Sequence, residues 1–195
     1  MPSDETRRIS DAGTLKAFSH PLRIALYRAL VVARTATASQ LAEQVDEAVS
    51  LVSYHLRRLA EHGLIEAAEP GSGDGRERWW RPAAESLTVR HEDVRDAPEK
   101  LAAQGVLVRA LLEQRVQMYR RHLDESATWD GSWRSAGFDG EYLPRLNAAE
   151  LTDLQHELDA LLRKYQALGR AAEEAGDTEG RENVAVHVQA FPFRA

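Results

Sequence analysis

The sequence predicts a mainly helical protein with a small β component: two short helices and a hairpin, then long helices and a terminal strand. Residues 50–62, SLVSYHLRRLAEH, space their apolar side chains along one face of a helix. Residues 98–125 and 148–174 repeat apolar side chains with a helical period over many turns. Residues 184–191 alternate in the way that indicates a half-buried strand. These patterns divide the chain into residues 1–95, with the short elements, and residues 96–195, with the long helices.

Composition indicates a soluble globular protein, with 43% hydrophobic and 29% charged residues among 195. No apolar run approaches 18 residues, so we expect no membrane span. The polar N-terminus lacks the apolar core of a secretory signal. The chain has no cysteine, which excludes disulfides and thiolate metal sites and is compatible with a reducing cytoplasm. We therefore expect a cytoplasmic protein.

The net charge of −6 argues against a generally basic nucleic-acid binder. Residues 1–95 are nearly neutral, however, and most of the negative charge lies in residues 96–195. Any contact with DNA would therefore be a focused patch. The basic residues are almost all arginine, which suits bidentate phosphate contacts, although GC-rich coding would give the same bias.

Residues 1–10 are expected to form a polar tail, followed by helices over residues 12–18, 21–33 and 39–44. Pro21 suits the first position of a helix because its missing N–H costs nothing there. Thr37 is predicted to be the N-cap of the third helix. A five- or six-residue turn then leads into residues 50–62, so the last two helices have the helix-turn-helix pattern.

The predicted helix over residues 50–62 has two faces. Val52, Leu56 and Leu59 form its apolar stripe, and short hydroxyls, an aromatic ring and two guanidinium groups lie on the other surface. Such polar groups suit the major groove, where arginine bridges guanine or phosphate. Gly63 supplies a left-handed C-cap. The helix alone is equally consistent with an ordinary amphipathic surface helix.

A β-hairpin is predicted over residues 64–81, with a Gly-rich turn between two strands. A hairpin in this place is the wing of a winged helix. Arg76 and Arg78 at its base would reach the adjacent minor groove or its phosphates. The alternative for these arginines is a solvated strand face.

Residues 18–82 resemble an ArsR-type winged-helix repressor domain. The resemblance rests on SHPLR at 19–23, LAE at 41–43, VSYHLRRL at 52–59 and GLI at 63–65. It implies a DNA-binding transcriptional regulator that acts as a homodimer. The sequence departs from the family at Asp46, where a glycine is usual, and at Ala48, where a serine usually caps the recognition helix.

The predicted DNA-contacting residues come from the recognition helix and the wing; they are Ser50, Ser53, Tyr54, His55, Arg57, Arg58, Arg76 and Arg78. His55 lies at the edge of the buried stripe, so it either packs the helix or contacts a phosphate. Asp46 and Glu47 place negative charge near the expected DNA backbone, which predicts modest or salt-sensitive affinity.

In the second half, residues 98–125 are predicted to be a dimerisation arm, or else a helix packed within its own subunit. Residues 128–146 are irregular and carry four aromatic side chains that could line a pocket for an organic effector; they are Trp129, Trp133, Phe138 and Tyr142. Alternatively, these rings anchor the loop to the core. Asn147 and Glu150 form a capping box for the helix over residues 148–174.

No sequence motif indicates catalysis, a cofactor or a metal site. The densest groups of hard ligands, His91-Glu92-Asp93 and His122 with Asp124, have no metal-site spacing. We therefore expect no enzyme, no cofactor and no metal. The favoured function is a homodimeric regulator that binds an inverted-repeat operator in double-stranded DNA. The alternative is a winged-helix module that docks another protein and does not bind DNA.

Overall fold

The computed structural model describes residues 6–69, 77–84, 86–89, 93 and 97–194. It has the predicted fold class, with long helices and two small sheets. The chain divides into two compact units, Met1–Ala127 and Thr128–Ala195. Within the described residues, no helix is both long and apolar enough to cross a membrane.

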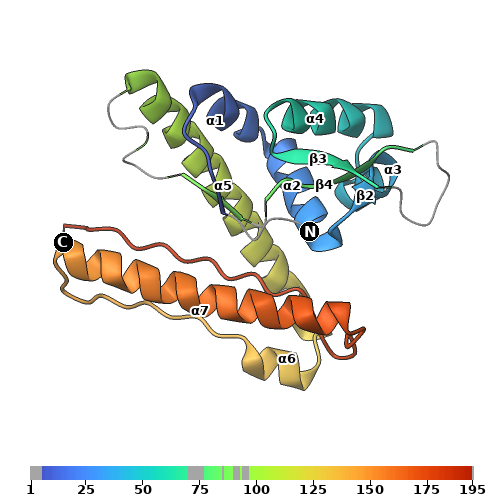
Figure 1. The fold of residues 1–195 in the computed structure, drawn as a ribbon. Helices are drawn as coiled ribbons and strands as arrows, with labels where there is room; N and C mark the ends of the chain where they lie inside the picture. Colours follow the sequence, from blue (N-terminus) through green and yellow to red (C-terminus); the bar gives the residue numbers. More distant parts are fainter. Residues whose placement is uncertain (1–5, 70–76, 85, 90–92, 94–96, 195) are drawn as a thin grey trace. The chain divides into compact units, whose positions relative to one another are not determined.

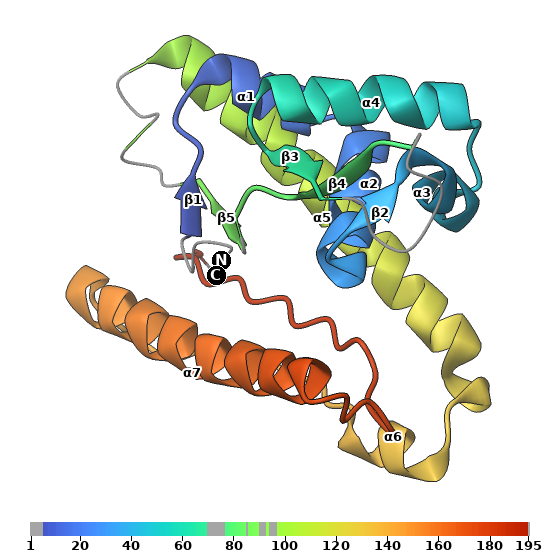
Figure 2. The ribbon, with the colours of Figure 1, turned by 45° about the vertical axis from the view of Figure 1, so that its right-hand side comes forward.

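The first unit packs its helices around one hydrophobic core (Figures 1 and 2). These helices are α1 (Ala12–Phe18), α2 (Pro21–Ala33), α3 (Ala38–Val45), α4 (Val49–Glu61) and α5 (Pro98–Glu125). Leu26 and Leu30 of α2 and Leu56 and Leu59 of α4 are fully buried. The predicted stripe of α4 therefore faces the core and leaves its polar surface outside.

Local sequence explains where the short helices begin and end. The Thr37 side chain accepts from the Gln40 backbone N–H, and the Gln40 side chain accepts from that of Thr37, so a capping box starts α3. Gly63, with φ of 62°, ends α4 in the predicted left-handed conformation. The Leu64 N–H then donates to the Leu59 carbonyl at 2.9 Å, which closes the last turn.

A three-stranded antiparallel sheet lies beside these helices in the order β2-β4-β3. Its strands are β2 (Ala36–Thr37), β4 (Trp79–Pro82) and β3 (Ile65–Ala68). Trp80 lies on the central strand between Ala36 and Ala67 and is 4% exposed. The second strand of the hairpin, which the sequence predicts over residues 76–81, is observed at Trp79–Pro82. Arg76 lies outside the described residues.

The prediction of a polar tail over residues 1–10 is wrong for β1 (Thr6–Arg8), which pairs in parallel with β5 (Ser86–Thr88). The sequence Thr-Arg-Arg has no strand alternation, so its pairing comes from tertiary contacts. The Arg7 guanidinium donates to the carbonyls of His62, at 2.7 Å from Nη2, and of Gly63. The N-terminal strand therefore holds the end of α4.

Helix α5 has one face in the core and another outside it. Ala103 and Leu107 are buried against the first unit, mainly against α1. Val108, Leu112 and Tyr119 are each about half exposed. The compact first unit therefore continues past residue 95, where the sequence suggested a boundary, because the first turns of α5 complete its core.

The second unit contains α6 (Gly131–Ala136) and α7 (Ala148–Glu174). Asn147 and Glu150 form the predicted capping box at the start of α7. Residues 131–136, expected to be irregular, form a short helix because the Asp130 side chain accepts from two backbone N–H groups. Along α7, Leu161, Tyr165 and Leu168 remain about half exposed.

The predicted strand over residues 184–191 is wrong, because residues 181–194 form neither helix nor strand. A strand exists only where another strand takes its hydrogen bonds. Two other segments that could have supplied a partner strand do not: β5 pairs with β1, and residues 141–143 have no strand structure. The alternating side chains Val184, Val186 and Val188 therefore remain about half exposed or more.

Candidate nucleic-acid interface

The outer surface of α4 presents most of the residues that the sequence singled out. Ser50, Tyr54, Arg57 and Arg58 are exposed, and Ser53 is half-buried. Residues four apart share a flank of a helix, so Ser53 and Arg57 lie on one flank and Tyr54 and Arg58 on the other. The helix thus offers polar groups over a broad surface, as a helix inserted into a major groove does.

The flank of Ser53 and Arg57 borders a hollow of about 330 Å³ between α4, α3 and the wing. Its lining also includes Ser39 of α3 and Arg78 beside Trp80 in the wing. The Arg78 guanidinium lies 4.5 Å from the centre of the Trp80 ring, a cation–π distance. Sequence reasoning missed Ser39, whose place beside the wing depends on tertiary packing.

The two arginines of this hollow keep donors for a ligand. Arg57 uses its Nε to donate to the Ser53 carbonyl at 3.1 Å, and within the described part of the chain its terminal nitrogens remain available to other partners. The buried Trp80 ring supports the Arg78 guanidinium. Glu77, which the sequence did not single out, accepts from the Ser39 hydroxyl at 2.6 Å and adds a negative charge at the rim.

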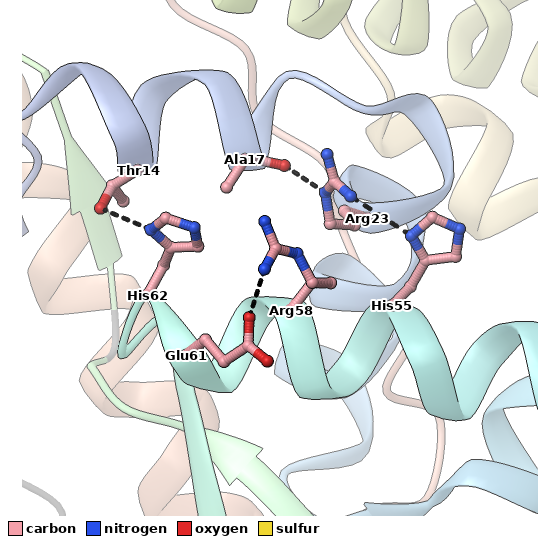
Figure 3. A network of polar contacts seen from close by, with 7 residues as sticks. All are labelled: Thr14, Ala17, Arg23, His55, Arg58, Glu61 and His62. Atoms are coloured by element: carbon pink, nitrogen blue, oxygen red, sulfur yellow. Dashed lines mark hydrogen bonds and ion pairs between the residues drawn. The ribbon is translucent and has the colours of Figure 1, made fainter.

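His55 does not belong to the exposed set. The side chain is 5% exposed, and its ring centre lies 4.5 Å from that of His20. Its Nδ1 lies 3.5 Å from Arg23 Nη1 (Figure 3). Of the two roles predicted for His55, the structure supports helix packing. A direct DNA contact by this buried ring is not supported.

The paired histidines predict a pH-dependent stability. Burial, then His20 and Arg23, lowers the pKa of His55, and burial, then Arg23, lowers that of His20. The two rings therefore bind protons more readily in the unfolded chain than in the folded one. Their neutral, packed form contributes fully to the free energy of unfolding above the ordinary histidine pKa of 6.5, and this contribution declines as the pH falls below that value. We expect the melting temperature to fall between about pH 7.5 and 5.5, and to fall less in His55→Asn. An equal fall in both proteins would show that this pair is not responsible.

The turn between α3 and α4 has the two departures noted in the sequence. Asp46 takes a left-handed conformation with φ of 54°, where the resembling family has glycine. Ala48 is the N-cap of α4 and provides no side-chain hydrogen bond to its first N–H groups. Glu43, Asp46 and Glu47 surround this turn and are exposed, so the approach to the start of α4 is acidic.

Ala48→Ser should add the missing cap. The residue already has the extended backbone of an N-cap, with φ of −65° and ψ of 135°. A serine hydroxyl there can accept from the N–H groups of the first turn, which stabilises a helix by about 0.5–2 kcal/mol. Chemical denaturation should show this increase in the free energy of unfolding. A decrease would indicate that these N–H groups already have a better partner.

The four aromatic residues predicted to bind an effector are not gathered in one pocket. The rings of Trp129 and Trp133 are 6.4 Å apart, whereas Phe138 is 93% and Tyr142 is 86% exposed. Effector binding by this set stays a prediction and would require another surface to enclose the exposed rings.

In the described part of the chain, no three side chains of histidine, aspartate or glutamate converge as a metal site would require. His91 and Glu92 lie outside that part, and Asp93 pairs with Arg8 at 2.5 Å. The His122 ring stacks with Tyr119 at 6.1 Å.

Comparison with known proteins identifies the central part of the first unit. Residues 18–67 match a family model described as a helix-turn-helix domain. No curated protein matches the chain. The range 18–67 covers α2, α3, α4 and the start of the wing, and it includes the motifs on which the predicted resemblance rests.

Several solved structures of regulators are similar to the chain, all with low TM-scores. A possible transcriptional regulator for arsenical resistance is 26% identical, with 57% of this chain and 94% of that one covered and a TM-score of 0.31. A MarR family transcription regulator is 18% identical, covering 81% and 79%, with a TM-score of 0.32. ZitR of Lactococcus lactis in complex with DNA is 17% identical, covering 77% and 74%, with a TM-score of 0.25. The match of the family model, together with the observed α3–turn–α4 geometry, makes residues 18–67 a helix-turn-helix domain.

Proposed function

We propose that this protein is a sequence-specific DNA-binding transcriptional regulator. The observation that carries the proposal is the exposed surface of α4. This surface presents Ser50, Tyr54 and Arg57, while the apolar stripe of the helix is buried in the core. Arg78 of the wing lines the same hollow as Arg57. A helix of this kind fits the major groove, and the wing reaches the neighbouring backbone. The match of residues 18–67 to the helix-turn-helix family supports the same function.

The acidic turn and the negative net charge favour the alternative, a winged-helix module that docks another protein. The two functions differ in one measurable property. A regulator should bind a duplex from its own promoter region more tightly than an unrelated duplex of equal length in a fluorescence-anisotropy titration at fixed salt. Equal, weak binding to both duplexes would favour the protein-docking module.

We further propose that the regulator acts as a homodimer through α5. Beyond its buried face, α5 exposes a second row of apolar side chains that includes Leu101, Val108, Leu112, Tyr119 and Leu123. The hydrophobic core includes no residue after Leu111 among those that the structure describes. Exposed apolar rows of this length mark interaction surfaces, and a second copy of α5 would cover this row.

Light scattering at micromolar concentration should therefore give about twice the chain mass of 21.8 kDa. Leu112→Glu should reduce that mass to the monomer value, because it places a charge in the row without touching the core. Ser132→Glu, which adds the same charge at an exposed site on α6, is the matched control. A monomer mass for the unaltered protein at high concentration would exclude the dimer.

A further inference from the structure

A cluster of cationic and aromatic side chains lies where the start of α2 meets α4, on the flank of α4 opposite the wing. Figure 3 shows two of its members, Arg23 and Arg58, together with the buried His55. His20 is the N-cap of α2 and Arg23 lies in its first turn. Tyr54 and Arg58 project from α4 beside them, above the buried His55, whose ring is 5.1 Å from that of Tyr54. The SHPLR motif at residues 19–23 contributes two of these groups.

The hydrogen bonds within the cluster leave donors unused. His20 Nδ1 accepts from the Leu22 N–H at 3.2 Å, so the neutral ring carries its proton on Nε2. Arg23 donates from Nε to the Ala17 carbonyl and directs Nη1 toward His55 Nδ1 at 3.5 Å. The guanidinium keeps further N–H groups on its terminal nitrogens. His20 is exposed and Arg23 half-buried, so a ligand can reach both.

The cluster has an excess of positive charge. Among the described residues, its one ion pair joins Arg58 Nη1 to Glu61 Oε2 at 2.5 Å, and both side chains are about half exposed, where such pairs contribute little. Burial and the charge of Arg58 lower the pKa of Arg23. The start of α2 adds the positive end of a helix dipole. A bound anion would offset the repulsion between the Arg23 and Arg58 guanidinium groups.

We infer that His20, Arg23, Tyr54 and Arg58 form an oxyanion site that binds a phosphate of the DNA backbone. The inference rests on the proposed function. A helix in the major groove lies between two phosphate backbones, one along each flank. The wing lies along one flank, and this cluster lies along the other. Phosphate contacts on both sides would fix the depth and angle of α4, which is how such contacts position a reading helix.

Two substitutions test the site with duplex DNA. Arg23→Gln removes the guanidinium charge, and His20→Asn removes the ring while keeping a side chain able to cap α2. Each substitution should weaken binding to the specific duplex and to an unrelated duplex by a similar factor, because a phosphate contact does not depend on sequence. Arg23→Gln should also reduce the slope of log affinity against log salt concentration by about 1. Arg109→Gln, an exposed arginine on α5, is the charge-matched control and should leave the slope unchanged.

Inorganic phosphate tests the same chemistry without DNA. It should shift the NMR signals of the His20 and His55 ring protons saturably, unlike chloride at equal ionic strength, and Arg23→Gln should abolish the response. Unchanged DNA affinity in both Arg23→Gln and His20→Asn, together with an unchanged salt slope in Arg23→Gln and normal melting temperatures, would overturn a backbone phosphate as the occupant. If that result came with an intact phosphate response in the wild type, the site would bind a free phosphate compound. If no duplex bound at all, the proposed function would fail, and the absence of phosphate shifts would also exclude the anion site.

Discussion

Trp80→Ala is expected to lower the free energy of unfolding by about 3–5 kcal/mol, the usual cost of removing a buried tryptophan. Trp80 lies on the central strand of the β2-β4-β3 sheet and is 4% exposed. Its ring also supports Arg78. The substitution therefore leaves a cavity and releases the wing, and denaturant titration should show the loss as a lower midpoint.

Trp79→Ala is the matched control, because Trp79 is the neighbouring residue on the same strand but only half-buried. Its loss should cost clearly less stability. Similar losses in the two variants would mean that Trp80 does not fill the core as described.

Combined replacement of Arg57 and Arg78 by alanine should nearly abolish specific DNA binding. Each arginine that contacts a base edge contributes roughly 1–3 kcal/mol of discrimination, and the two line one hollow beside the wing. Both side chains are exposed, so the melting temperature should change little. Anisotropy titrations on the specific and an unrelated duplex measure the loss of specific binding, and thermal unfolding of the variant measures its melting temperature.

Lysine at position 57 distinguishes a contact with a base from a contact with the DNA backbone. Arg57→Lys keeps the charge but not the planar fork, so it should retain nonspecific affinity and lose discrimination if Arg57 reads a base. Retained discrimination would assign Arg57 to the backbone. Wild-type binding by the double alanine variant would exclude this flank of α4 from the interface.

The helices were predictable because their signals are local. Pro21 at the start of α2, the Thr37 capping box and the left-handed Gly63 each act within a few residues, and the structure confirms all three. The bounds of α5 and α7 also match the predicted ranges, since their apolar repeats and the cap at Asn147 are continuous in sequence.

The errors occur where pairing depends on distant residues. β1 forms because β5 lies beside it, and nothing in Thr-Arg-Arg signals that neighbour. Residues 184–191 have the stronger alternation but gain no partner strand. Alternation reports which side chains would share a face, whereas a strand also needs backbone hydrogen bonds from elsewhere.

The candidate site was predictable only in part. The polar surface of α4 follows from helical spacing, so Ser50, Tyr54 and Arg57 were placed correctly on the exposed side. His55 lies at the edge of the apolar stripe, and its burial depends on His20 and Arg23, which approach from another helix. Their cluster could not be found from spacing within residues 50–62.

Selection of binding sites from a pool of random DNA duplexes tests the central claim most directly, because it asks whether the protein distinguishes one DNA sequence from another. A regulator with one recognition helix per subunit in a two-fold dimer should enrich an inverted repeat with half-sites about one helical turn apart. Enrichment should disappear with the Arg57 and Arg78 double variant. A pool that remains random after repeated selection at low salt would contradict the account.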